Sequence, residues 1–417
     1  MSAEATNPAT SKLDLQKWRP VPMALVVVGA LISVIGAFAA PKSFGFAYLV
    51  AYIFFLSLCL GSMVLVLLHH LFDAGWSVPI RRIVEHNACL LFPVMALLWI
   101  PIAVLAPQMY PWMHLQAIHQ PDHALHAKEA LLNKGAWYGI SIALFFIWGL
   151  LSYRLRYWSL RQDQTGDARC TYAMRFHAAW GIFAFAVTLT LAIILWSKSL
   201  EHQWFSTMYG VYYFAESTWT TLATVYVMVA VLQRAGPLAP VITARQVHDI
   251  GVLWFAFTVF YAYIHFAQYF IIWNGNMPEE TFWYLKRENG AWWQFGMLLI
   301  FGHFFVPFLA LMRIDAKLSL PVMIPLAVWA WFMHWVDVSF NIVPVHQPTG
   351  YSSAVLGMTL GAMALILGVL ILAWLRFFRA HPPFPQKDPR MLEALGLHHP
   401  QASSIAVAKY EGKPGVS

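Results

Sequence analysis

The run from Phe46 to Leu71, FAYLVAYIFFLSLCLGSMVLVLLHHL, contains 26 residues and no Lys, Arg, Asp or Glu. An α-helix rises about 1.5 Å per residue, so about 20 apolar residues cross the hydrocarbon core of a bilayer. This run therefore predicts a membrane-spanning helix and excludes an ordinary soluble domain.

Nine similar runs flank it, so we predict an all-α membrane protein with about ten transmembrane helices. Of the 417 residues, 60% are hydrophobic and 11% are charged, which fits this class. We expect a cytoplasmic N-terminal segment 1–19, a transmembrane domain 20–378 that begins with a retained anchor, and a cytoplasmic, poorly ordered, Pro- and His-rich tail 379–417. The predicted spans are 20–40, 46–71, 82–106, 135–153, 172–196, 207–233, 247–273, 291–312, 319–341 and 354–375.

The distribution of basic residues predicts the orientation. Twenty of the 26 Lys and Arg residues fall on the side that holds both termini. Cytoplasmic loops carry an excess of Lys and Arg, so we predict that both termini are cytoplasmic. The same bias explains the net charge of +7 without a nucleic-acid partner, and the partner that we expect is the lipid bilayer.

Four acidic side chains lie within the predicted spans, namely Glu85, Glu216, Asp249 and Asp337. A charge at the centre of a bilayer costs at least about 2.5–3.5 kcal/mol, so such residues persist mainly in pathways or internal pairs. Each has a histidine nearby in the sequence or on another span, in the same order His86, His265, His248 and His334. Because acids and histidines in such rows accept and pass protons, these residues are candidates for a proton path.

Two segments, 74–86 and 235–249, share an Ala-Gly pair, a proline-bearing loop, and an arginine followed at three and four residues by an acid and a histidine. The triads are Arg82/Glu85/His86 and Arg245/His248/Asp249. Four spans separate them, which predicts two parallel four-helix bundles, spans 2–5 and 6–9. The triads are either cytoplasmic mouths of a proton path or clusters that neutralise buried charge, and the short repeat could also be coincidence.

Polar residues follow one face of span 207–233 at spacings of three and four: Tyr209, Tyr212, Glu216, Thr220 and Thr224. The three spans that follow add His265, His303, His334 and Asp337. If these faces point inward, a polar row leads from Asp249 and His248 on the inside to Asp337 and His334 on the outside. The alternative is a set of structural interhelical hydrogen bonds.

We expect this chain to bind no cofactor or metal and to hold no catalytic residue of its own. Its three cysteines are separate, no CxxCH motif is present, and no GxGxxG follows a predicted strand. The histidines also lack the two-per-helix spacing of bis-histidine cytochromes.

Three motifs carry a resemblance to a known family: Leu68–Arg82, the run Met109-Tyr-Pro-Trp112 with downstream Lys128, and Phe266–Asn276. From the first span to the tenth, the chain resembles the F subunit of alternative complex III, an NrfD-like membrane subunit of a bacterial quinol:cytochrome c oxidoreductase. The resemblance implies a place in the inner (cytoplasmic) membrane beside a paralogous NrfD-like subunit, an iron–sulfur subunit and haem c subunits. Quinone (menaquinone or ubiquinone), haem c and iron–sulfur clusters would then be expected in those partners.

The sequence therefore predicts an integral subunit of a respiratory quinol:cytochrome c (or other acceptor) oxidoreductase that provides a proton-conducting path. One alternative is a proton- or ion-coupled secondary transporter, which would also explain the repeat and the buried acids. Another is a directly quinol-binding NrfD-type subunit, for which His334 and Asp337 are the headgroup candidates.

Overall fold

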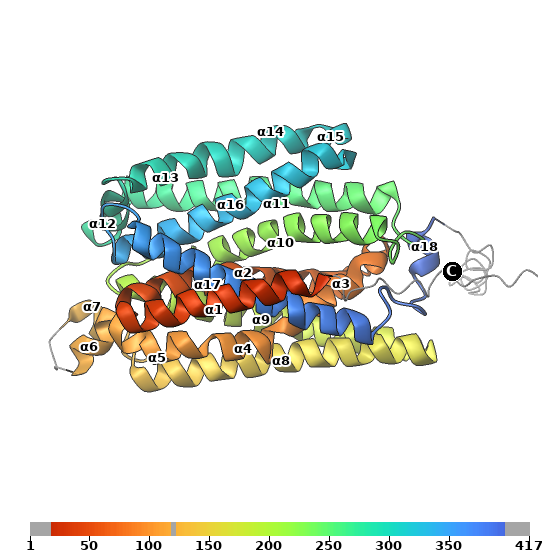
Figure 1. The fold of residues 1–417 in the computed structure, drawn as a ribbon, viewed down its shortest axis with the longest axis horizontal. Helices are drawn as coiled ribbons and strands as arrows, with labels where there is room; N and C mark the ends of the chain where they lie inside the picture. Colours follow the sequence, from red (N-terminus) through yellow and green to blue (C-terminus); the bar gives the residue numbers. More distant parts are fainter. Residues whose placement is uncertain (1–17, 118–121, 397–417) are drawn as a thin grey trace, which may run out of the picture.

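The computed structural model describes residues 18–117 and 122–396, and all regular structure in this part of the chain is helical (Figure 1). Nine of these helices are long and apolar enough to cross a membrane, and Gly75–Met109 adds a tenth if its two bent halves form one span. The prediction of an all-α membrane protein with about ten helices is confirmed. The membrane-length helices are α1 Pro20–Ala39, α2 Pro41–Leu71, α8 Lys134–Thr165, α9 Arg169–Trp196, α10 Tyr209–Arg234, α11 Ala244–Gly275, the α13–α14 segment Trp292–Met312, α16 Leu320–Ile342, which η7 Val343–Val345 extends, and α17 Ser353–Ala380.

The predicted continuous span 82–106 is wrong. The chain forms η3 Gly75–Ser77, α3 Val78–Ala88, η4 Cys89–Leu91, α4 Val94–Leu98 and α5 Ile100–Met109, with a bend of 53° before α5. Phe92 is extended ahead of Pro93, and Pro101 lies in the first turn of α5. Proline lacks the backbone N–H and disfavours helical geometry in the residue before it, so the two prolines interrupt the span.

The membrane helices form two groups. The first bundle contains α2, the α3–α5 segment, α8 and α9, and the second contains α10, α11, the α13–α14 segment and α16 (Figure 1). These are the two predicted four-helix bundles. Helices α1 and α17 pack along each other and against α2, outside both bundles.

Helices α2 and α10 join the two bundles through a close crossing at Gly61. A Cβ atom at this position would lie 2.2 Å from Oγ1 of Thr221 and 2.4 Å from the backbone oxygen of Ser217. The hydroxyl of Thr221 also donates to the backbone oxygen of Leu58 at 3.2 Å. Small residues allow helix backbones to approach closely in membranes, and here they bring the centre of α10 against α2.

The core of the first bundle is built from tryptophan rings. The ring centroid of Trp99 lies 5.3 Å from that of Trp137 and 5.9 Å from that of Trp196. The ring centroids of Trp148 and Trp196 lie 6.1 Å apart. All four side chains are buried. The second bundle has a different core, which contains acids and histidines.

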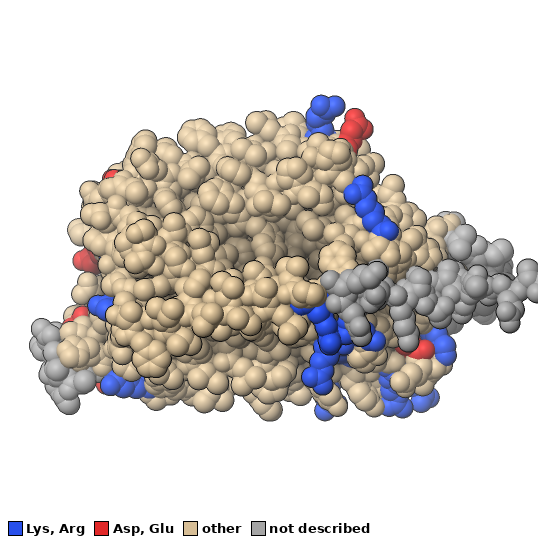
Figure 2. All heavy atoms as spheres, viewed as in Figure 1, with Lys and Arg blue, Asp and Glu red and all other residues tan. Residues whose placement is uncertain are grey.

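The two ends of the molecule differ in charge. Most Lys and Arg side chains in Figure 2 lie at the end that carries α15 Ile314–Leu318 and α18 Met391–Ala394, which we name the basic end. The opposite end carries α6 Pro111–Ala117, α7 His123–His126, η5 Lys198–Glu201 and α12 Pro278–Arg287, and we name it the loop end. Between the two ends, the face in Figure 2 is almost free of charged residues, as a membrane-facing surface should be.

The expectation of a poorly ordered tail is wrong for residues 381–396. This segment packs across the basic end, and the side chains of Asp388 and Arg390 are buried there. Ion pairs to Arg81 and Asp73 hold it, so a composition poor in apolar residues did not prevent packing. Residues 397–417, the rest of the predicted tail, lie outside the described residues, as do residues 1–17 of the N-terminal segment.

Candidate functional site: a buried carboxylate between two histidines

Glu216 lies two turns after the start of α10 and is 1% exposed. The predicted polar face of this helix is real, since Tyr209, Tyr212 and Thr220 are buried on it as well. Spacings of three and four residues place these side chains on one side of a helix, and that side faces the interior of the second bundle.

Two histidines from two other helices contact the carboxylate of Glu216. Nδ1 of His334 on α16 lies 2.5 Å from Oε1, and Nε2 of His303 lies 2.9 Å from Oε2. The prediction that His265 is the histidine partner of Glu216 is wrong. The hydroxyl of Tyr261 lies 3.5 Å from the His265 ring, while the Tyr261 ring stacks on His303, so His303 occupies the position next to the carboxylate.

His303 belongs to a π-helical turn, η6 Leu299–Phe305, between α13 Trp292–Leu298 and α14 Val306–Met312. Its ring lies between the rings of Trp219 and Tyr261, with centroid distances of 4.0 and 3.8 Å. The indole N–H of Trp329 donates to the backbone oxygen of Gly302 within the turn. Single π-helical turns shift the register of a helix and are frequent at functional sites.

The hydrogen bonds of His334 determine where its proton lies. The hydroxyl of Ser57 donates to the backbone oxygen of Phe54 at 2.6 Å, so its oxygen faces Nε2 of His334, at 2.7 Å, as an acceptor. Nε2 also lies 3.3 Å from the same backbone oxygen, which can only accept. Nε2 therefore carries a hydrogen. With Nε2 as the donor, the 2.5 Å contact between Nδ1 and Oε1 of Glu216 is a hydrogen bond when one further proton lies on either the imidazole or the carboxyl.

A second acid continues the site toward the loop end. The hydroxyl of Tyr212 donates to Oδ1 of Asp337, and Nδ2 of Asn341 donates to the same hydroxyl at 3.2 Å. The Tyr212 ring lies 5.6 Å from Tyr261 and 5.5 Å from His265, which links these side chains to the Glu216 site. Glu216, Asp337 and their partners therefore form one buried polar cluster.

An ion pair at the loop end completes this chain of contacts. Arg287 donates to the backbone oxygen of Asn341 at 2.9 Å and pairs with Glu201 at 3.1 Å, and Lys286 pairs with the same carboxylate at 2.9 Å. Burial raises the pKa of Glu201, but the two cations outweigh it and leave the pKa below its ordinary value. Polar contacts thus lead from the Glu216 cluster to the loop end.

Toward the basic end the surroundings are apolar. The indole N–H of Trp331 donates to Oγ1 of Thr224, the last polar residue of the predicted α10 face. Beyond it lies a cavity of about 420 Å³ between α2, α3, α10, α16 and α17, with Asn87 as one of its few polar lining residues. Figure 2 shows a hollow in this part of the surface. Contacts from Glu216 therefore reach the loop end more directly than the basic end.

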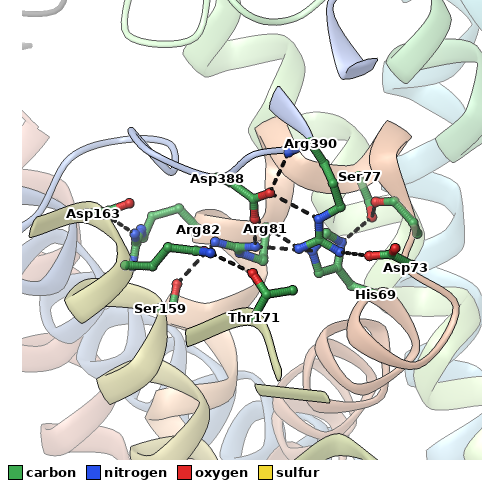
Figure 3. A network of polar contacts seen from close by, with 12 residues as sticks. His69, Asp73, Ser77, Arg81, Arg82, Ser159, Asp163, Thr171, Asp388 and Arg390 are labelled. Atoms are coloured by element: carbon green, nitrogen blue, oxygen red, sulfur yellow. Dashed lines mark hydrogen bonds and ion pairs between the residues drawn. The ribbon is translucent and has the colours of Figure 1, made fainter. Parts of the chain in front are cut away.

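The first triad belongs to a buried charge cluster at the basic end, and Figure 3 shows Arg81 and Arg82 of this cluster. Glu85 pairs with Arg81 at 3.1 Å and, as the spacing predicted, with Arg82 at 3.0 Å. His86 does not pair with Glu85, because its Nδ1 contacts Arg156 of α8 at 2.9 Å. Residues three and four apart share a helix face whereas adjacent residues do not, so the arginines take the glutamate.

The second triad does not match the first. Arg245 lies 4.0 Å from Asp249 and His248 lies 3.7 Å from it, and these three side chains are 69%, 30% and 32% exposed. They lie in the first turns of α11 at the basic end, and all three side chains are partly exposed there. Exposed pairs of this kind contribute little stability, and the inner end of the predicted polar row is not connected to Glu216 here.

The structure thus brings Glu216, His303 and His334 into direct contact and links Asp337 and His265 to them through Tyr212. The triad residues, Arg82, Glu85, His86, Arg245, His248 and Asp249, lie apart from this cluster. Sequence reasoning missed Ser57, the second partner of His334. A lone serine in an apolar run is a weak signal, because serine often bonds only within its own helix.

Comparison with protein-family models and with curated proteins finds no match to this chain.

Proposed function

We propose that this chain is an integral membrane subunit of a quinol:cytochrome c (or other acceptor) oxidoreductase and that it provides a proton-conducting path through Glu216. The observation that carries the proposal is the 2.5 Å contact between Oε1 of Glu216 and Nδ1 of His334, inside a bundle of membrane-length helices. Burying ionisable groups in a membrane is unfavourable, so such a cluster is a functional site by default. The resemblance of three motifs to the alternative complex III family supports the respiratory context of the proposal.

The proton stays within hydrogen-bonding distance of several acceptors. It moves between Nδ1 of His334 and Oε1 of Glu216, while Nε2 of His303 lies at the other carboxylate oxygen. Asp337, Tyr212 and Asn341 extend the path toward Arg287 at the loop end. This chain supplies the proton groups, and the quinone, haem c and iron–sulfur clusters of the partner subunits supply electron transfer.

A role as the quinol site receives less support. The cavity beside Asp337 measures about 10 Å³, which is room for about one water molecule and not for a quinone ring. His334 is wholly buried and its two nitrogens contact Glu216 and Ser57. We therefore assign the quinol headgroup to the expected paralogous subunit.

The test is Glu216→Gln in the complete complex, reconstituted in proteoliposomes, with electron transfer and pH change measured together. Glutamine keeps the size and hydrogen-bonding capacity but does not titrate. We expect electron transfer to continue and proton movement per electron to fall. The control is Glu279→Gln, an exposed glutamate on α12. Unchanged proton stoichiometry in Glu216→Gln would reduce the cluster to a structural role.

A further inference from the structure

Residues 381–396 cross the basic end as a strap, a name that we keep for this segment. Only Pro385, Asp388, Arg390 and Ala394 of the strap are buried, and most of its other residues are exposed or half-buried. A segment with few buried apolar contacts opens locally at low free energy. Polar contacts rather than a hydrophobic core therefore hold the strap in place.

The centre of the strap is a carboxylate bound by arginines. The Asp388 side chain is 0% exposed and pairs with Arg81 of α3 and, at 2.9 Å, with Arg390. Arg390 also pairs at 2.7 Å with Asp73 in the turn after α2 (Figure 3). Asp73 in turn pairs at 2.5 Å with Arg175 of α9. The positive charges of Arg81 and Arg390 outweigh burial and hold the pKa of Asp388 well below its usual range, so it is charged at neutral pH.

The strap bridges the two bundles. At its start, the backbone N–H of Gln386 donates to Asp163 at 2.9 Å, and Lys387 donates to the backbone oxygen of Gln164, both on α8 of the first bundle. At its end, Gln246 on α11 of the second bundle donates to the backbone oxygen of Ala394 at 2.8 Å. The strap is therefore bound at both margins of the basic end as well as at its centre.

Beneath the strap lie buried groups that carry charge and hydrogen-bonding capacity. A cavity of about 230 Å³ between α2, α3, α10 and α11 is lined by apolar side chains together with His69, Ser77 and Arg81. Helix α18 packs on η3, which forms one wall of this cavity. Arg81 lies at the end of the molecule, yet it is 0% exposed. The strap lies between it and solvent, and Asp388 of the strap pairs with its guanidinium group.

We propose that the strap is a tethered peptide ligand of the Arg81 site and that its release opens the basic end to water. Asp388 is the anchor, because its carboxylate enters the buried guanidinium site, and Arg390 locks it against Asp73. Bound, the strap keeps solvent from Arg81, Glu85 and the cavity beneath. The strap's binding to the Arg81 site does not depend on the proton path proposed above, because that path leads from the Glu216 cluster toward the loop end.

The test measures solvent access directly in the purified membrane assembly. Ser159 is 0% exposed and its hydroxyl accepts from Arg81 at 3.4 Å, so a cysteine at this position reports on the site. Ser159→Cys, in a background with Cys170→Ser, is labelled with a membrane-impermeant maleimide. A chain ending at Ala380 lacks the strap, and a chain ending at Gly396 keeps it as the matched control. We expect about tenfold faster labelling without the strap, which corresponds to about 1.4 kcal/mol.

A peptide of residues 381–396 added in trans should restore protection to the shortened chain, and the same peptide with Asp388→Asn should not. In the full chain, Asp388→Asn should speed labelling, while Asp315→Asn, on α15 at the same end, should not. Equal labelling rates with and without the strap, or protection by both peptides alike, would overturn the proposal. Glu216→Gln should leave labelling unchanged, so a failure of the proton path and a failure of the strap give different results.

Discussion

Oε1 of Glu216 on α10 lies 2.5 Å from Nδ1 of His334 on α16, while Nε2 of the same ring faces the hydroxyl of Ser57 and the backbone oxygen of Phe54 on α2. Three helices from different parts of the sequence are needed for this arrangement. Glu216 and His334 therefore act as one unit, and the effects of replacing them should be measured both singly and together.

His334→Gln and Glu216→Gln should each lower proton flow by about tenfold or more in proteoliposomes, as expected for the loss of a proton-transfer group. The double variant should lose no more than either single variant, since each single change already removes the contact between the two titrating side chains. His177→Gln on α9, a half-buried histidine outside the cluster, is the control. Losses that add in the double variant would separate the two residues functionally.

Asp337→Asn should reduce proton flow but leave the KM for quinol within about twofold of the original value. The reason is steric, since only about 10 Å³ is free beside this side chain. The KM for quinol is measured from steady-state quinol oxidation by the whole complex. A marked rise in KM with intact assembly would instead place the headgroup at Asp337, as the quinol-binding alternative requires.

The chain should purify with partners that carry haem c and iron–sulfur clusters. This expectation follows from the proposed function and from the resemblance to the alternative complex III family. Visible absorption and iron analysis of the purified assembly measure it. A stable, cofactor-free monomer that takes up a substrate would favour the transporter alternative.

Gly61→Ala should destabilise the protein by about 1–3 kcal/mol, because the added methyl group would lie 2.2 Å from Thr221 and overpack the α2–α10 crossing. Gly357→Ala on α17 is the matched control, since nothing lies within 4 Å of its Cβ position. Gly357→Ala should not lower the free energy of unfolding, because alanine has a higher helix propensity than glycine. Thermal unfolding in detergent compares the two, and equal stability would contradict a tight crossing.

The Glu201–Arg287 pair should make stability depend on pH in the acid range. The pKa of Glu201 is lowered from 4.5 in the folded state, so its contribution is complete above about pH 4.5 and is lost as pH falls through the folded pKa. Glu201→Gln should therefore lose about 1.5–3 kcal/mol at pH 7 and little at strongly acid pH. Unfolding measured across this range, with Glu279→Gln as control, tests the sign.

Helix positions were predictable from the sequence because hydrophobic length and the spacing of polar residues are local properties. The buried face of α10 follows from the spacing of Tyr212 and Glu216 alone. The partners of Glu216 were not predictable in the same way, because they depend on how three helices rotate against each other. The π-helical turn that presents His303 adds one residue per turn and moves the ring away from the register of a regular helix.

Two other differences have physical causes that the sequence shows only in part. The triads at Arg82 and Arg245 have the same spacing, yet the first is enclosed by α8 and the strap while the second begins a helix at the surface. The tail has the composition of an unfolded segment, but the buried Asp388 carboxylate pairs with Arg81, which is 307 residues away in the sequence. Contacts over such separations are set by the fold and leave no local pattern.

The tryptophan core of the first bundle has an electrical consequence. A membrane potential of 100 mV is worth about 2.3 kcal/mol for each elementary charge that crosses, so any leak dissipates stored energy. The rings of Trp99, Trp137, Trp148 and Trp196 pack against one another inside the first bundle and carry no group that titrates. Under the proposed function, this layer of indole rings gives protons no side chain through which to leak past the Glu216 cluster.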